Sequence, residues 1–154
     1  MRVQDVVAAM FILIAGVGRV GSALAHTMLE EGHEVSCLDE DPDALLHLEA
    51  VLGGDWIEAG GSFTVGQALE LDALTAAGVE RADAFVASTD GDNTNLVIAQ
   101  IARLQFAVPT VVARVLDPRR AEWYEQQGVR TICPTRSAIE MLSEEVREGT
   151  GEGS

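Results

Sequence analysis

Short apolar runs alternate with segments of helical periodicity along most of the chain. The apolar runs predict six β-strands, which we place at residues 11–15, 35–38, 63–65, 84–87, 110–115 and 129–133. The intervening segments predict helices over residues 20–31, 69–77, 93–104, 118–127 and 138–147, with a further helix beginning at Pro42. Strands and helices in such regular alternation are typical of a doubly wound α/β domain. We therefore expect a single domain with a mainly parallel six-stranded sheet flanked by helices.

Local sequence signals mark several of the helix starts. Aspartate followed by proline occurs at residues 41–42 and 117–118, where aspartate is a good cap and proline suits the first helical position. Ser137 and Glu140 have the spacing of a capping box and predict that the last helix begins at residue 138.

Apolar spacing also predicts which side chains face the sheet. Val20, Leu24 and Met28 follow a helical repeat and should form the inward face of the first helix. The glycine-rich stretch 53–62 carries Trp56, which we expect to fold back onto the body of the domain.

We divide the chain into an N-terminal extension at residues 1–9, a domain at 10–136, and a C-terminal helix with a flexible tail at 137–154. Met10 stands directly before the first strand and is a second candidate for the initiating residue. The N-terminal segment does not fit a signal peptide, because Asp5 interrupts it and no small-residue cleavage site follows.

Composition and charge narrow the functional classes. The chain has 154 residues, 47% of them hydrophobic, and a formal net charge of -15. This charge disfavours binding to nucleic acid or to anionic lipid. No run reaches 18 apolar residues, so we expect no membrane insertion and a cytosolic protein. All ten basic residues are arginine, and without lysine the chain lacks a phosphate-loop lysine, a Schiff-base lysine and a Tyr-x-x-x-Lys pair.

The cysteines and histidines suggest no special chemistry. Cys37 and Cys133 lie far apart in apolar runs, which indicates buried thiols in a reducing compartment. His26, His33 and His47 are not spaced as metal ligands, so we expect no metal site.

A glycine-rich turn joins the first strand to the first helix. It reads Gly16-Val17-Gly18-Arg19-Val20-Gly21, a G-x-G-x-x-G pattern whose position between strand and helix is typical of Rossmann-like nucleotide-binding domains. Gly16 permits the tight turn, Gly18 lets backbone N–H groups approach a pyrophosphate, and Gly21 lets the helix pack closely on the strand. Phosphates would then rest at the helix N-terminus.

An acid stands where such a domain would need one. Asp39 ends the second strand, 18 residues after Gly21, and its carboxylate can accept the hydroxyls of an adenosine ribose. A 2′-phosphate would face Asp39, Glu40 and Asp41 together, which disfavours NADP. The adenine ring would lie by the end of the third strand, at residues 65–68. The alternative is a structural glycine turn beside a solvated acidic loop.

Two further strand ends carry polar candidates. Residues 88–95 are almost all short and polar, and Thr89 and Asp90 are candidates for nucleotide contact, while Asp92 is equally suited to cap a helix. Arg114 lies inside an apolar strand and needs an anionic partner, either a nearby acid or a nucleotide phosphate.

With these pieces placed, the chain resembles the nucleotide-binding TrkA-N domain of bacterial potassium-transport regulators, also called RCK-N or KTN. The resemblance covers residues 10–136 and is most specific between Ala77 and Ile101, which include the motif T-D-x-D-x-x-N. It implies a homodimeric or larger regulator that binds NAD(H) or ATP/ADP. It also implies assembly on the cytoplasmic face of a membrane potassium-translocating subunit of Trk or Ktr type, whose gating responds to nucleotide.

Carried over by position, the resemblance implies a set of site residues. The phosphates would be held by the glycine turn, that is by Gly16, Val17, Gly18, Arg19, Val20 and Gly21, with Arg19 serving a terminal phosphate. Asp39 would hold the ribose, and the adenine would lie by Gly66 and Gln67. Thr89 and Asp90 would lie by the nucleotide, and Arg114 would approach a phosphate. Two features depart from the family. Gln67 replaces a frequent aspartate, and the second regulatory domain of many members does not follow, so the chain is a single-domain member or part of a longer one.

Three functional hypotheses remain open on these residues. The first is a non-enzymatic sensor in which nucleotide shifts the population of dimer geometries. In that case the last helix either crosses to a second subunit as a coupling element or packs on its own domain. The second is a small NAD-dependent oxidoreductase, which is disfavoured because no substrate domain and no suitable base are evident. The third is a dimerisation module that has lost ligand binding.

Overall fold

The computed structural model describes residues 8–151, so most of the extension predicted at residues 1–9 and the last three residues lie outside the described part. Its strands are β1 (Phe11–Ala15), β2 (Glu34–Asp39), β3 (Ser62–Val65), β4 (Ala84–Ala87), β5 (Thr110–Arg114) and β6 (Arg130–Ile132). Its helices are α1 (Arg19–Glu30), α2 (Ala44–Leu52), α3 (Leu71–Ala76), α4 (Asp92–Gln100), α5 (Pro118–Gln126) and α6 (Pro134–Gly149). A 3₁₀ turn, η2 (Val79–Arg81), precedes β4, and a π-helical turn, η3 (Ile101–Gln105), continues α4.

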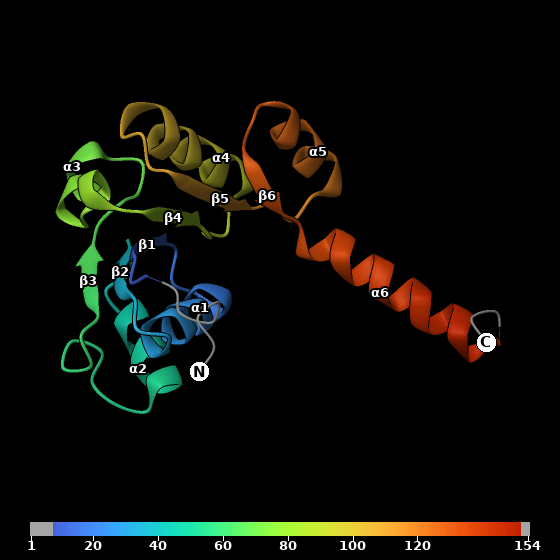
Figure 1. Ribbon diagram of the computed structural model, residues 1–154, viewed down its shortest axis with the longest axis horizontal. Coiled ribbons are helices and arrows are strands. Elements are labelled where there is room, and N and C mark those ends of the chain that lie inside the picture. The colour runs from blue at the N-terminus through green and yellow to red at the C-terminus, as the bar shows by residue number, and fades with distance from the viewer. Residues whose placement is uncertain (1–7, 152–154) are drawn as a thin grey trace.

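The strands form one six-stranded sheet in the order β3-β2-β1-β4-β5-β6, and every pairing is parallel. This confirms the doubly wound, Rossmann-like fold that the alternation of elements predicted. Figure 1 shows helices on both sides of the sheet and α6 extending away from the body. Between residues 8 and 151, no helix has the length and apolar character needed to cross a lipid bilayer.

Strand β1 lies at the centre of the sheet and contributes to both halves of the core. Phe11, Leu13 and Ala15 pack in the cluster shared with α3, α4 and α5. Ile12 and Ile14 pack in the other cluster, with residues of α1 and α2. All five residues of β1 are buried, as the lack of polar alternation predicted, because a parallel strand covered on both faces has no solvent side.

Trp56 closes the second cluster. Its ring is completely buried, and its indole N–H donates to the carbonyl oxygen of Ser62 at 3.0 Å. Gly61 packs against this ring so closely that any side chain there would clash with it. The expectation that the 53–62 stretch folds its aromatic residue back onto the domain is therefore confirmed.

Two predicted helix starts are wrong. Helix α2 begins at Ala44 rather than Pro42, because the N–H groups of Ala44, Leu45 and Leu46 bond carbonyl oxygens three residues earlier, which forms turns ahead of the α-helical bonding. Helix α6 begins at Pro134 rather than residue 138, since proline occupies its first position and the sulfur of Cys133 accepts the N–H of Arg136 at 3.5 Å. The predicted start of α5 at Asp117-Pro118 is confirmed.

The predicted inward face of α1 also needs correction. Val20 is 49% exposed, and the buried residues of α1 are Gly21, Ser22 and Ala25. Leu24 and Met28 do pack against the core, as predicted. Gly21 faces the glycine turn, where a Cβ would clash with the carbonyl oxygen of Gly16, so the buried face of α1 begins at Gly21 and leaves Val20 outside it.

Candidate functional site

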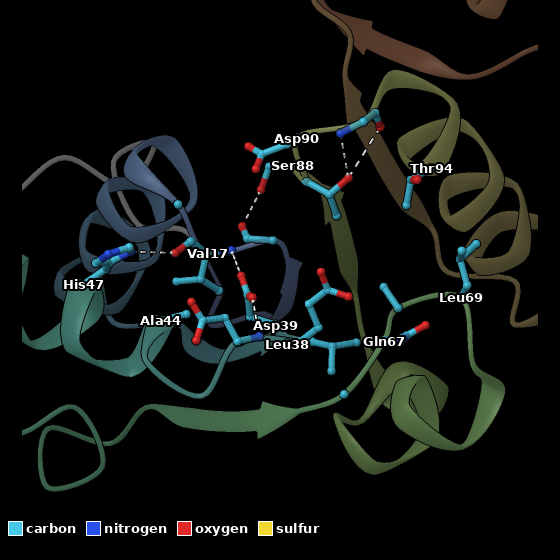
Figure 2. A pocket seen from close by; sticks show the side chains of 18 residues that line it. Val17, Leu38, Asp39, Ala44, His47, Gln67, Leu69, Ser88, Asp90 and Thr94 are labelled. Carbon is cyan, nitrogen blue, oxygen red and sulfur yellow. Dashed lines mark hydrogen bonds between the residues drawn. The ribbon is translucent and has the colours of Figure 1, made fainter.

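A cavity of about 480 Å³ opens at the carboxyl edge of the sheet, between the ends of β1 and β4. The strand order reverses at this point, which is where open α/β sheets bind their ligands. Four segments line the cavity: the β1–α1 turn, the β2–α2 segment, the β3–α3 loop and the β4–α4 loop. Figure 2 shows His47 at one end of this group and Thr94 and Leu69 at the other, with Val17 and Asp39 between them.

Most of the predicted site residues meet in this cavity. The lining includes eight of them: Gly16, Val17, Gly18, Asp39, Gly66, Gln67, Thr89 and Asp90. Four others do not line it: Arg19, Val20, Gly21 and Arg114. Residues from four separate loops were thus placed together by a sequence argument based on strand ends.

The three glycines of the turn differ in what a side chain at each position would meet. Gly16 has a φ of +97°, and a Cβ there would lie 2.5 Å from the backbone nitrogen of Thr89. A Cβ on Gly21 would clash with the carbonyl oxygen of Gly16. Around Gly18, by contrast, a Cβ would meet nothing within 4 Å. Packing inside the protein therefore requires Gly16 and Gly21, whereas Gly18 leaves open space on the cavity wall.

The first turn of α1 offers unpaired N–H groups beside this space. Gly18 is the N-cap, no side chain bonds the N-terminal amides, and the first turn contains no acid. Four N–H groups at a helix start lack helical partners, and the helix dipole adds a partial positive charge. An uncapped start on a cavity wall suits an anionic group such as a phosphate.

Asp39 connects the end of β2 to the glycine turn. Its Oδ2 accepts the backbone N–H of Val17 at 2.8 Å, and its Oδ1 accepts the N–H of Asp41 at 2.9 Å. Each carboxylate oxygen has a second lone pair that these bonds leave unused. The carboxylate is therefore fixed in position and can still accept ribose hydroxyls.

Below the cavity, a network of hydrogen bonds fixes the end of β4. The Ser88 hydroxyl donates to the carbonyl oxygen of Gly16 at 2.8 Å. Asn95 is buried; its side-chain oxygen accepts both the N–H and the hydroxyl of Thr89, and its amide donates to the carbonyl oxygens of Thr89 and Arg114. Sequence reasoning assigned Asn95 no individual role, although the spacing of the T-D-x-D-x-x-N motif contains the signal.

Arg114 lies behind the β4 loop rather than in the cavity. Its Nη2 donates to the carbonyl oxygen of Thr89 at 2.9 Å and lies 3.9 Å from a carboxylate oxygen of Asp90. Its Nε is buried and has no hydrogen-bond partner. In this structure the anionic neighbour of Arg114 is therefore Asp90, the first of the two partners that the sequence left open.

Asp92 bonds a neighbouring loop rather than its own helix. It is the first residue of α4, and its carboxylate accepts the backbone N–H groups of Leu116 and Asp117 at 2.9 and 3.0 Å. This carboxylate joins the end of the cavity loop to the segment that leads from β5 into α5.

His47 is the clearest omission of the sequence analysis. It lines the cavity from α2, with its Nδ1 3.4 Å from the carbonyl oxygen of Val17. Ala44 also lines the cavity without having been predicted, and Thr94 lines it from within the polar segment 88–95, where it was not singled out. The contributions of His47 and Ala44 depend on how α2 lies against the strand ends, and no motif in the sequence marks these two positions.

The two cysteines are buried and unpaired, as expected. Burial, with a smaller contribution from Asp39, raises the pKa of the Cys37 thiol to about 12, so this thiol stays protonated and unreactive near neutral pH. Within residues 8–151, no three His, Cys, Asp or Glu side chains gather as ligands for a metal ion.

Comparison with known proteins gives a consistent set of relatives. Residues 12–134 match the model of the TrkA-N domain. The chain is 42% identical over 134 residues to the Trk system potassium uptake protein TrkA of Streptomyces coelicolor, covering 86% of this chain and 57% of that protein. It is 35% identical over 138 residues to TrkA of Mycobacterium tuberculosis, covering 88% and 59%. The chain thus spans less than two thirds of the length of these relatives.

Solved structures with the same fold include nucleotide complexes. The Kef CTD of Shewanella denitrificans in its AMP-bound form superposes with a TM-score of 0.74 at 27% identity, covering 92% of this chain and 82% of that one. The GsuK channel bound to NAD has a TM-score of 0.64 at 21% identity, covering 82% of this chain and 22% of the channel. GsuK bound to ADP gives 0.63 at 21% identity, with coverage of 84% and 32%.

Proposed function

Because the chain belongs to the TrkA-N domain family, we propose that it is a nucleotide-sensing regulatory module of potassium transport that binds NAD(H) or ATP/ADP. One observation carries this proposal. The cavity at the strand-order reversal brings together an uncapped helix start, the open space at Gly18 and the fixed carboxylate of Asp39. These are the groups that the phosphates and the ribose of an adenine nucleotide need. The AMP, NAD and ADP complexes of proteins with this fold support the same ligand class.

In this proposal each ligand group has its own partner. The phosphates rest on the first turn of α1, where Gly18 leaves room for them. The ribose hydroxyls donate to Asp39. The adenine lies by Gly66 and Gln67 at the end of β3, both of which line the cavity. Gln67 supplies a neutral amide where the family often has a carboxylate, so it suits an adenine contact that needs both a donor and an acceptor.

The hydrogen-bond network below the cavity provides a route for coupling. Thr89 lines the cavity and is held by Asn95, which also bonds the carbonyl oxygen of Arg114 at the end of β5. Asp92 bonds the loop that follows. A nucleotide that changes the position of Thr89 therefore acts on the segment entering α5. The nucleotide can change the state of the membrane partner only if it binds two arrangements of these elements with different affinities.

We propose that the chain acts as a homodimer or larger assembly and that α6 takes part in it. No residue of α6 is buried in the described chain, and Ile139, Leu142 and Val146 form an exposed apolar stripe at helical spacing. A second copy of the chain would cover this stripe. The membrane partner would be a potassium-translocating subunit of Trk or Ktr type, with this module on its cytoplasmic side.

The proposed activity is regulatory and not enzymatic. The alternative, an NAD-dependent oxidoreductase, needs a proton-transfer group beside the nicotinamide. His47 is the one histidine among the described residues of the cavity wall, and its ring nitrogen lies against the carbonyl oxygen of Val17, beside the glycine turn. One nucleotide complex can be tested for both functions, by measuring nucleotide binding and by assaying hydride transfer.

Titration calorimetry with NADH, NAD, ATP and ADP, run beside a hydride-transfer assay, tests the proposal. We expect micromolar binding of at least one nucleotide and no turnover with simple alcohols or hydroxy acids. Turnover would favour the oxidoreductase, and absence of binding to all four nucleotides would leave only the dimerisation module.

A further inference from the structure

We infer that the exposed side of α2 is a docking surface for a segment that combines apolar side chains with lysine or arginine, and that this segment lies on the cytoplasmic side of the membrane partner. The inference rests on the proposed function and names the face of the module that contacts that partner. The α2 surface consists of Leu46, Ala50, Val51 and Ile57, and none of these residues lines the nucleotide cavity.

Helix α2 is more apolar than its packing on the sheet requires. Seven of its nine residues are apolar, yet only Ala44 and Leu48 are buried. Its exposed residues are Leu46, His47, Ala50 and Val51. A helix that packs by one face normally carries polar and charged residues on the other face. In α2 the outward side is apolar instead, with Leu46 62% exposed and Val51 44% exposed.

The turn that follows α2 extends this apolar surface. The Glu49 carboxylate accepts the backbone N–H of Trp56 at 3.0 Å, and the Trp56 ring is buried in the core beneath the helix. Ile57 comes directly after this anchored residue and is 55% exposed. The turn is therefore held against α2 before any partner binds, so docking would not need to order it.

Acidic residues surround the apolar surface. Residues 40–58 contain six acids and no arginine or lysine. Asp43 precedes the helix, Asp55 and Glu58 follow it, and the last turn contains no basic residue. A helix C-terminus carries a partial negative charge that a cation would stabilise. Among the described residues, none forms a hydrogen bond or ion pair with the Glu58 side chain, so the cation has to come from a partner.

This combination of charge and apolar surface specifies the chemistry of the occupant. An apolar strip with an acidic rim is complementary to an amphipathic segment whose apolar face is flanked by basic residues. Cytoplasmic segments of membrane proteins carry an excess of lysine and arginine, and the amphipathic ones add an apolar face. An anionic lipid surface is a poorer occupant, because the acids of the rim would be repelled by it.

The position of α2 leaves this surface free in the proposed assembly. Helices α1 and α2 cover one face of the sheet, α3, α4 and α5 cover the other, and α6 extends away from the body (Figure 1). A partner on α2 therefore does not compete with a second copy on α6. His47, on the same helix, lines the nucleotide cavity, so the docking surface and the nucleotide site share one element.

Fluorescence anisotropy with synthetic peptides and the full chain tests the inference. The probe is a labelled helical peptide of about 18 residues with leucine on one face and lysine on its flanks. One control peptide has glutamate in place of lysine, and the other keeps the lysines but has serine in place of leucine. At physiological ionic strength we expect the leucine–lysine peptide to bind at least about tenfold more tightly than either control.

Matched variants locate the binding surface. Leu46→Gln should raise the dissociation constant of the leucine–lysine peptide by about fivefold or more, whereas Leu104→Gln, at a 69% exposed position on η3, should leave it unchanged. Glu58→Gln should raise it by about threefold, whereas Glu122→Gln, at an exposed position on α5, should have no effect. All four changes are at exposed positions, and thermal unfolding of each variant checks that the fold is kept.

Three results would overturn the inference. Equal effects of Leu46→Gln and Leu104→Gln, or of Glu58→Gln and Glu122→Gln, would show only a general attraction of cationic peptides to an acidic protein. Binding to phosphatidylglycerol vesicles that Leu46→Gln abolishes would assign the surface to lipid. A change in oligomeric state caused by Leu46→Gln, measured by light scattering, would assign it to a second copy.

Nucleotide binding is measured separately on the same proteins. Leu46→Gln should bind NADH and ATP as the parent does, because Leu46 does not line the cavity. Loss of specific peptide binding with nucleotide binding intact would overturn the inference alone. A parent chain that binds none of the tested nucleotides would contradict the proposed function, whatever the peptides do.

Discussion

The carboxylate of Asp39 accepts the backbone N–H of Val17 at 2.8 Å, joining the end of β2 to the glycine turn after β1. Val17 is buried, and its N–H has this carboxylate as its partner. The acid that is proposed to hold the ribose therefore also fixes the loop that is proposed to hold the phosphates. Two ligand-binding elements from different strands are set in register before any ligand arrives.

Replacing Asp39 should therefore weaken nucleotide binding and also destabilise the ligand-free fold. Asp39→Ala should reduce the affinity for every adenosine ligand by about 1–3 kcal/mol, because charge-assisted hydrogen bonds to the ribose are lost. It should also reduce the free energy of unfolding by about 1–2 kcal/mol, because the Val17 N–H loses its acceptor. Calorimetry and urea unfolding measure the two effects. Asp39→Asn retains an acceptor and should restore most of the stability; unchanged affinity in both variants would show that Asp39 does not hold the ligand.

Substitutions at two glycines of the turn should distinguish effects on folding from effects on nucleotide binding. Gly21→Ala places a methyl group against the carbonyl oxygen of Gly16 and should destabilise the domain by about 3 kcal/mol or more. Gly18→Ala meets nothing in the protein and should change stability by less than about 1 kcal/mol. It should nevertheless weaken nucleotide binding about tenfold or more, since its methyl group enters the space proposed for the phosphates. Full nucleotide affinity in folded Gly18→Ala would place the phosphates elsewhere.

The buried amide of Asn95 should be a stability determinant of the cavity loop. Asn95→Ala leaves the Thr89 N–H and two carbonyl oxygens with fewer partners, and should cost about 2–4 kcal/mol of unfolding free energy. Asn95→Asp preserves the shape and the acceptor but removes the donor to the carbonyl oxygens of Thr89 and Arg114, and it should be nearly as harmful because it buries a charge. Denaturant unfolding of both variants checks this. If Asn95→Ala is as stable as the parent, the network contributes little.

The order of strands and helices along the chain, and most of the residues that line the cavity, could be predicted from the sequence because both follow from local signals. Neighbouring residues in the sequence are enough to infer the structural role of the apolar run 11–15, of the glycines after it and of Asp39. The positions that escaped prediction depend on tertiary packing. His47 lines the cavity from α2, with its ring against the glycine turn, and Arg114 bonds the Thr89 carbonyl oxygen and does not line the cavity.

Helix ends show a second limit of local reasoning. At 41–42 and 117–118 the same dipeptide predicts the same start, yet the helix begins directly after Asp117 and two residues later than expected after Asp41. Both aspartate carboxylates accept the N–H two residues later. The difference lies in the backbone, where the Asp117 carbonyl oxygen accepts the N–H four residues later and the Asp41 carbonyl oxygen accepts the N–H three residues later. Such competition between similar local bonds cannot be settled from the dipeptide alone.

The buried thiol of Cys37 should make stability fall at alkaline pH. Its pKa is raised from 9.0 to about 12 in the folded chain. Between these values the folded chain holds a proton that the unfolded chain has released, so raising the pH favours unfolding. Burial raises the pKa of Tyr124 as well, which acts in the same direction. Urea midpoints at pH 8 and pH 10.5 should fall more in the parent than in Cys37→Ala. Equal losses would show that Cys37 does not set this dependence.

The exposed stripe on α6 should control assembly. Ile139, Leu142 and Val146 are 55%, 67% and 67% exposed, and they lie on one face of a helix whose other side carries Glu140, Glu144 and Glu148. Near its start the helix is held by the 2.8 Å ion pair between Arg136 and Glu125, a hydrogen bond that lowers the pKa of Glu125.

Since a second copy is proposed to cover the stripe, Leu142→Glu should raise the dimer dissociation constant by about tenfold or more. Light scattering over a concentration series measures this. Glu144→Gln, on the acidic side of the same helix, should leave the dimer intact. Leu142 lies far from the cavity. Its replacement should therefore leave nucleotide affinity unchanged when the affinity is measured at concentrations where the parent protein is monomeric. A dimer that survives Leu142→Glu would have to form through another surface, and α6 would then have no part in transmitting nucleotide occupancy between subunits.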